Sequence, residues 1–131
     1  MTERALVEAV VKGLQDKGFM VATEVPNFYR SADIGALDKV GNIWVVECKV
    51  SNIGRAIEQS KIHRLSADKV FIATFAKKTK EGTLRRIREA GIGLLYVMRD
   101  GYLSDPIEEP GDNNPWDLAR ERLLHRIMER R

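Results

Sequence analysis

The sequence predicts an α/β domain in which helices cover both faces of a mixed β-sheet, an α/β/α sandwich. Apolar residues recur with helical spacing in some segments and with strand-like spacing in others. These segments follow one another in the order α-β-β-β-α-β-α-β-β-α, and the later helices serve as crossover connections between strands. The chain has 131 residues, which is a usual size for a single domain, so we expect one domain over residues 1–131.

The first half of the chain is predicted to form a helix and an antiparallel meander of three strands. The helix, over residues 2–17, is indicated by apolar residues at the spacing of one buried stripe: Val7, Val10, Val11 and Leu14. The strands are expected at residues 19–25, 32–37 and 43–50. Pro26 with Asn27 is expected to end the first strand, and a polar, glycine-containing connection of hairpin length joins the other two.

The second half alternates helices with strands, as expected where crossovers join the strands of a sheet. Ser51 or Asn52 is suited to cap the first of these helices. Helices are expected at residues 51–65 and 79–90, and strands at residues 70–73, 94–98 and, after an Asp100-Gly101 turn, 102–104. The last of these strands is expected to lie at the edge of the sheet.

Residues 99–131 are expected to lie outside the core, which covers residues 2–98. Residues 105–114 contain two prolines, a glycine and four acids, which is typical of a surface linker. Asn114 and Pro115 suit the N-cap and first position of a final, basic helix. Its apolar side is formed by Trp116, Leu123, Leu124, Ile127 and Met128. We expect this side to pack either on the domain itself or on a second copy in a homodimer.

Composition and charge limit the classes of function. The chain carries 22 basic and 19 acidic residues, and the basic excess lies in residues 77–88 and 120–131. Such segments suit contacts with the phosphates of DNA, although they are also typical of solvated helix faces. A single cysteine excludes an internal disulfide and a multi-thiolate zinc site. The sequence has neither a membrane-spanning apolar run nor a recognisable secretory signal, so we expect a cytoplasmic protein without a membrane partner.

Asp33, Glu47 and Lys49 are the residues with the clearest chemical meaning. Side chains alternate along a strand, so Glu47 and Lys49 share one face, whereas Cys48 points to the other face with Trp44. Charged side chains at the end of a very apolar strand are unfavourable unless they are paired or used. The neighbouring strand can place Asp33 beside them, which would bring two carboxylates and an ammonium group together.

This set of groups is suited to metal-dependent hydrolysis. Two carboxylates and a backbone carbonyl, that of Cys48, form an oxygen site that suits Mg²⁺ or Mn²⁺. Such an ion lowers the pKa of a water molecule and draws charge from a phosphate oxygen. Lys49 is expected to orient or activate the attacking water, and the reaction would be hydrolysis of a phosphodiester. The competing interpretation is an ion-pair network with a structural role only.

The same residues carry a resemblance to the PD-(D/E)XK nucleases, which share the restriction-endonuclease-like αβββαβ core. The matching elements, within residues 2–98, are Ala32-Asp33-Ile34, the strand Trp44-Val-Val-Glu47-Cys-Lys49, and the helix and strand that follow. Holliday-junction resolvases and related repair nucleases are similar. The resemblance implies that Asp33 and Glu47 are metal ligands and that Lys49 is the catalytic lysine. It also implies that Gln59 supports the lysine or a phosphate oxygen.

The sequence departs from this family in two places. Ala32 stands where a proline often precedes the first acid. The first helix has Val7 where many members carry a further glutamate, so Glu8, its neighbour, or Glu24 on the first strand is a candidate for that carboxylate. The expected function is a metal-dependent deoxyribonuclease without a small-molecule cofactor. The alternative is a non-catalytic nucleic-acid-binding or scaffold domain that retains the fold.

Contacts with DNA are expected from residues around the predicted site. Tyr29 and Arg30 precede Asp33 and are suited to stacking on a base and holding a phosphate. Further basic candidates are Arg55, Lys61, Lys77, Lys78 and Lys80. His63 is interpreted as a surface residue or a phosphate contact rather than as a general base.

Overall fold

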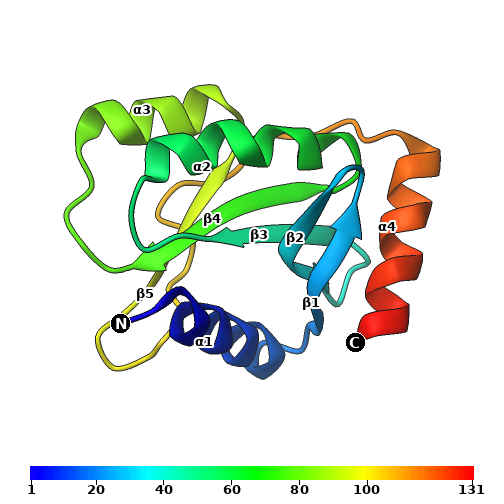
Figure 1. The fold of residues 1–131 in the computed structure, drawn as a ribbon, viewed down its shortest axis with the longest axis horizontal. Coiled ribbons are helices and arrows are strands. Elements are labelled where there is room, and N and C mark those ends of the chain that lie inside the picture. Colours follow the sequence, from blue (N-terminus) through cyan, green and yellow to red (C-terminus); the bar gives the residue numbers. More distant parts are fainter.

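A five-stranded β-sheet with the order β1-β2-β3-β4-β5 lies at the centre of the computed structural model, which describes residues 1–131 (Figure 1). The strands are β1 (Met20–Asn27), β2 (Arg30–Leu37), β3 (Ile43–Cys48), β4 (Lys69–Phe75) and β5 (Gly93–Val97). β1, β2 and β3 pair in antiparallel fashion, whereas β3, β4 and β5 run parallel. The predicted mixed sheet, with a meander followed by crossovers, is confirmed.

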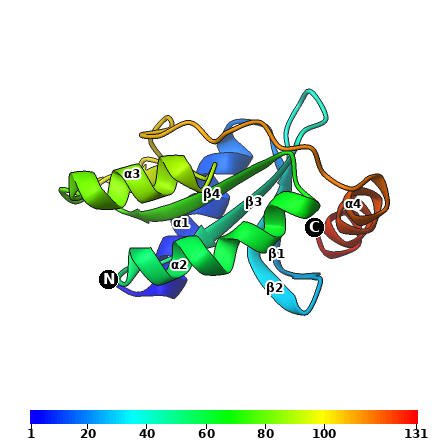
Figure 2. The same cartoon turned by 90° about the horizontal axis from the view of Figure 1, so that it is seen from above.

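Helices cover both faces of this sheet, as Figures 1 and 2 show. The helices are α1 (Glu3–Asp16), α2 (Ile53–Ser60), α3 (Glu81–Glu89) and α4 (Asp117–Arg130), and α2 continues into a 3₁₀ helix, η1 (Lys61–Leu65). α1 lies on one face, α2 and α3 lie on the other, and α4 stands beside β1 and β2. This arrangement is the predicted α/β/α sandwich. None of these helices is both long enough and apolar enough to cross a membrane.

The two faces of the sheet bury separate hydrophobic clusters. On the α1 side, Leu6 and Val10 belong to one cluster with Val46 of β3. On the other side, Ile57 of α2 belongs to a second cluster with Val45. Successive residues of β3 therefore enter different clusters, so that this strand is covered on both faces. The charged side chains of this strand lie at its end, where Glu47 and the next but one residue, Lys49, are half-buried.

α4 packs on its own domain, beside β1 and β2. Leu123 and Ile127 are fully buried in the cluster on the α2 side of the sheet. Gly35 of β2 makes room for this packing, because a Cβ atom at Gly35 would lie 2.9 Å from Cγ1 of Ile127. Arg120, near the start of α4, forms an ion pair with Asp68, which precedes β4, with 2.8 Å between Nη2 and Oδ2. The centre of the apolar side of this helix is thus buried within the chain, whereas Trp116 and Met128 at its ends are exposed.

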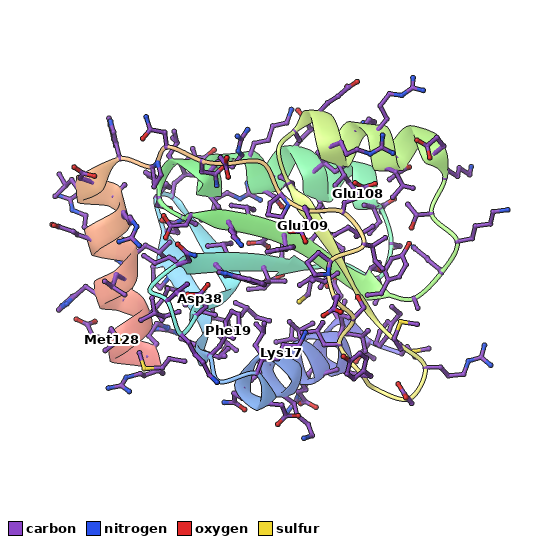
Figure 3. All side chains as sticks on the ribbon, turned by 180° about the vertical axis from the view of Figure 1, so that it is seen from behind. Lys17, Phe19, Asp38, Glu108, Glu109 and Met128 are labelled. Carbon is purple, nitrogen blue, oxygen red and sulfur yellow. The ribbon has the colours of Figure 1, made fainter.

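The connection between β5 and α4 differs from the prediction. The expected edge strand at residues 102–104 does not form, because only Leu103 makes a bridge, with Val97. Farther along, Glu108 makes a second bridge, with Leu94, and Figure 3 labels Glu108 where this connection crosses β5. Two separate bridges therefore cover the edge that β5 would otherwise leave unpaired.

α4 also begins later than the sequence indicates. The predicted N-cap is Asn114, whereas Trp116 precedes the first helical residue and provides no capping side chain. The side-chain amide of Asn113 donates to the Ala67 carbonyl at 3.0 Å, and the backbone amide of Trp116 donates to the Leu65 carbonyl at 2.9 Å. These two contacts hold the residues before α4 against η1, so the helix begins only after them.

β1 does not end at Pro26, so the predicted break is wrong. Pro26 and Asn27 both pair with β2, and the turn between the strands consists of Phe28 and Tyr29. β1 lies at the edge of the sheet, where a residue without a backbone N–H is tolerated. The hairpin therefore extends beyond the point where the sequence pattern ends.

Candidate active site

Asp33 and Glu47 face each other where β2 and β3 stop forming backbone pairs. Ile34 and Val46 form the last pair of the register, so Asp33 and Glu47 occupy the next position. Their side chains provide hydrogen bonds there. Oδ2 of Asp33 accepts from the Cys48 amide at 2.8 Å, and Oε1 of Glu47 accepts from the Asp33 amide at 3.4 Å. The second oxygen of each carboxylate takes no part in these bonds.

The surroundings of Asp33 and Glu47 make it unfavourable for both carboxyl groups to be ionised at once. Burial, followed by the neighbouring Glu47, raises the pKa of Asp33 from 3.8 to about 7, although the bond from the Cys48 amide acts in the opposite direction. Perturbed carboxyl groups of this kind are concentrated at functional sites. A bound cation would remove the repulsion, and the two oxygens that the protein leaves unused are donors of the type that Mg²⁺ and Mn²⁺ prefer.

A third oxygen donor is available from the main chain of β3. The Cys48 amide points to Asp33 on β2, whereas the next amide, of Lys49, donates to the Ala73 carbonyl on β4 at 3.0 Å. The amide and carbonyl of one strand residue point to the same side, so the Cys48 carbonyl is directed toward β2 as well. No group of three or more His, Cys, Asp or Glu side chains is arranged to hold a metal. A cation here would therefore use main-chain and water oxygens besides the two carboxylates.

The thiol of Cys48 lies on the opposite face of β3 and belongs to the core, as predicted. Its side chain is buried in the cluster that also contains Val46. Burial, with the nearby Asp33 and Glu47 charges, raises the pKa of the thiol well above its usual value. The neutral, buried thiol has no role in the chemistry of the site.

Lys49 follows directly on β3, and its side chain is half-buried. Its Nζ lies 3.6 Å from Oε1 of Glu3, in the first turn of α1, and Glu3 also contributes to the raised pKa of Asp33. The carboxylate that α1 brings close to Lys49 is therefore that of Glu3, which lies more than one helical turn before the predicted Glu8. The Glu8 side chain is 69% exposed and pairs with Arg4 at 3.4 Å.

A cavity of about 660 Å³ opens beside Asp33. Glu8 and Glu24, the two candidates for a further carboxylate, both line it, together with Arg4 and Lys12. Glu24 is exposed and has a φ of 49°, a left-handed value that is uncommon for residues other than glycine. The cavity gives a ligand access to Asp33 from the α1 side of the sheet.

His63 has a different place from the one predicted, because it is buried beside Glu47. Only 1% of the residue is exposed, and Nε2 lies 3.0 Å from Oε1 of Glu47. The side-chain amide nitrogen of Asn27 donates to Nδ1 of His63 at 2.8 Å and to Oγ of Ser66 at 2.8 Å. Because Nδ1 accepts, the proton of the neutral ring is on Nε2 and is donated to Glu47. His63 therefore holds Glu47 in position.

The sequence contains a signal for this position of His63 in the spacing of α2. Ile53, Ala56, Ser60 and His63 follow one another at intervals of three or four residues, which is the spacing of one helix face. The first three are buried with His63. Gln59, predicted to act beside Lys49, is half-buried on the last turn of α2 and makes no hydrogen bond to the acid pair.

The residues predicted to contact DNA fall into two groups. Arg55, Lys78, Lys80 and Tyr29 are exposed and make no ion pair, and Arg30 is half-buried at the start of β2. Lys61 is instead paired with Glu58 at 2.6 Å, and Lys77 donates to the Val50 carbonyl at 3.3 Å. In the basic segment 120–131, Arg120, Arg126 and Arg130 donate to Asp68 or to carbonyls of β1. Much of this C-terminal segment thus attaches α4 to the domain.

The comparisons with known proteins bear on the fold. No family model and no curated protein matches this sequence. A solved structure of SPO1766, a protein of unknown function from Silicibacter pomeroyi, superimposes with a TM-score of 0.76 at 23% identity, covering 98% of this chain and 85% of that chain. A structure of Pyrococcus furiosus SfsA in complex with Ca²⁺ gives a TM-score of 0.44 at 18% identity, covering 81% and 60%. The likeness to SPO1766 shows a common fold over almost the whole chain.

Proposed function

We propose that this protein is a metal-dependent nuclease that hydrolyses phosphodiester bonds in DNA at a site formed by Asp33, Glu47 and Lys49. The observation that carries the proposal is the meeting of two partly buried carboxylates at the diverging end of β2 and β3, with a lysine two residues after the second acid. The resemblance of these residues to the PD-(D/E)XK motif supports it. The α-β-β-β-α-β order of residues 3–75 supports it as well.

Each side chain has its own role in the proposed reaction. Asp33, Glu47 and the Cys48 carbonyl would hold a divalent cation, which would lower the pKa of a water molecule and withdraw charge from the phosphate. Lys49 orients the attacking water, and its ammonium group opposes the negative charge that develops on the phosphate oxygens. The water loses a proton to solvent as its oxygen forms a bond to phosphorus. The bond from phosphorus to the leaving oxygen breaks, and that oxygen takes a proton from solvent. His63 keeps Glu47 fixed during this step.

A second candidate function is binding of nucleic acid without cleavage. Two observations favour it: the site provides only two adjacent carboxylates, and Lys49 is engaged with Glu3 at 3.6 Å. In the nuclease, the substrate phosphate would draw Lys49 away from Glu3. In the binding domain, this ion pair would persist and the acids would hold no metal. The two functions therefore differ in their response to Mg²⁺ or Mn²⁺.

Cleavage of DNA in the presence of each metal tests the proposal. Supercoiled plasmid, a single strand and a branched duplex are incubated with the protein and Mg²⁺, Mn²⁺ or EDTA. We expect cleavage with either metal and none with EDTA. Asp33→Asn and Lys49→Ala are expected to lower the rate by at least about 100-fold while binding of DNA is retained.

The matched controls are exposed residues of the same type outside the site. Asp105→Asn removes a carboxylate that is 92% exposed, and Lys39→Ala removes an exposed lysine. Both are expected to cleave at the wild-type rate. Loss of cleavage in the controls would indicate a general effect of charge, and cleavage that survives Asp33→Asn would contradict the assignment of the reaction to this site.

A further inference from the structure

A second feature close to this site is a pocket between the β1–β2 turn and the start of α4. It has a volume of about 290 Å³, and its walls include Phe28, Trp116 and Leu118 together with Arg122 and Arg126. No acidic residue lines it. Pockets for small molecules usually measure about 300 to 1,000 Å³, so this one suits a single flat group such as a nucleobase.

The turn on one side of this pocket consists of two aromatic residues, of which Phe28 has an unusual backbone conformation. Phe28 has a φ of 58°, a left-handed value that bulky residues rarely adopt and that glycine or asparagine adopts readily. Phe28 is 38% exposed and Tyr29 is 81% exposed, so the core does not require either ring. Backbone strain of this kind is concentrated at ligand sites.

The other side of the pocket presents a tryptophan and two arginines. Trp116 is 69% exposed, although its backbone is fixed by the hydrogen bond to the Leu65 carbonyl. Arg122 is exposed and makes no ion pair, and Arg126 is attached by one nitrogen to the Pro26 carbonyl at 3.2 Å. Exposed aromatic rings beside guanidinium groups are the combination by which proteins bind unpaired nucleotides.

A chain of hydrogen bonds between buried side chains links the pocket to the acid pair. Asn27 lines the pocket, and its amide donates to His63, whose other ring nitrogen donates to Glu47. Asn27 and His63 thus connect the pocket to the carboxylate of Glu47 by hydrogen bonds.

We propose that this pocket binds an unpaired base of DNA, stacked on Phe28 and Trp116, while Arg122 and Arg126 bind the adjacent phosphates. The inference rests on the proposed nuclease function and deepens it, because it assigns DNA with a single-stranded segment as the substrate class. The bases of an intact duplex are stacked on one another, so their faces are not available to these rings.

The fluorescence of Trp116 tests this assignment directly. The chain has two tryptophans, and the other, Trp44, packs against Phe19 and Phe71. In EDTA, a single-stranded thymidine oligonucleotide is expected to quench the wild-type fluorescence in a saturable manner. Trp116→Phe, which retains Trp44, is expected to show no quenching, and a duplex of the same length is expected to quench far less.

Affinities measured with a labelled oligonucleotide extend the test to the other residues. Phe28→Asn, which suits the left-handed φ of this position, is expected to bind the single strand about tenfold more weakly. Arg122→Ala is expected to weaken binding and to lower the salt dependence by about one phosphate contact. The matched control is Tyr102→Ala, which removes an exposed aromatic ring from the loop after β5 and is expected to leave the affinity unchanged.

The outcomes separate this proposal from the nuclease function. Quenching that depends on Trp116, without cleavage in Mg²⁺ or Mn²⁺, would retain the pocket and exclude the nuclease. Cleavage with wild-type affinity in both Trp116→Phe and Phe28→Asn would overturn the pocket and retain the nuclease. Equal quenching by the duplex would overturn the substrate class. Self-association that Trp116→Phe abolishes, without quenching by the oligonucleotide, would assign the pocket to a second copy and overturn the proposal.

Discussion

Replacing Asp33 with asparagine is expected to stabilise the protein at alkaline pH while it abolishes cleavage of DNA. Asparagine retains an oxygen that can accept the hydrogen bond from the Cys48 amide, which lies 2.8 Å from Oδ2 of Asp33. It removes the negative charge that burial and Glu47 make unfavourable. The substitution therefore isolates the effect of the charge from that of the hydrogen bond.

The sign and the size of this effect follow from the pKa of Asp33. The folded protein has a pKa of about 7 at this group, against 3.8 for an ordinary aspartate, so the folded state binds the proton more tightly. Stability therefore falls as the pH rises between these values, and the loss is complete above about pH 7. A difference of about three pH units corresponds to about 4 kcal/mol. Partial exposure to solvent reduces it to about 2 kcal/mol.

Urea denaturation at pH 8 and at pH 4 measures this effect. Asp33→Asn is expected to be more stable than the wild type by about 2 kcal/mol at pH 8 and by less than about 0.5 kcal/mol at pH 4. Asp105→Asn, at an exposed position, is expected to match the wild type at both pH values. A variant that is less stable at pH 8, or a difference that is the same at both pH values, would refute the reasoning.

Two further predictions concern the packing of α4 and the buried histidine. Gly35→Ala is expected to lower the free energy of unfolding by about 1 to 3 kcal/mol, because the new Cβ would lie 2.9 Å from Cγ1 of Ile127. Gly82→Ala is the matched control in α3, where a Cβ meets open space, and it is expected to raise the free energy of unfolding by about 0.5 to 1 kcal/mol. Equal effects in urea denaturation would contradict this. His63→Ala removes the hydrogen bond to Glu47 and is expected to lower stability by about 2 to 4 kcal/mol, so a nearly neutral result would argue against the buried network.

The fold was largely predictable because hydrophobic spacing reports which faces are buried. The alternation in β3 predicted that Val46 and Cys48 enter one cluster, and they do so. The sequence also indicated that the neighbouring strand can place Asp33 beside Glu47, and the register of β2 and β3 brings them together. The roles of the two acids in metal binding and catalysis remain predictions.

The features that the sequence did not predict depend on contacts between distant segments. Glu3 approaches Lys49 because the start of α1 lies near the end of β3, which no local pattern reports. Trp116 replaces Asn114 as the N-cap of α4 because its amide bonds to η1. The basic neighbours of His63 predict a surface position, whereas its spacing matches the buried face of α2, where it lies.

Binding of Mn²⁺, followed by the electron paramagnetic resonance signal of the free ion, tests the central claim most directly. The account predicts that the wild-type protein binds Mn²⁺ and that both Asp33→Asn and Glu47→Gln bind it at least about tenfold more weakly. Asp105→Asn is expected to bind it as the wild type does. Equal dissociation constants in the wild type and the two site variants, or no binding by the wild type, would contradict the account.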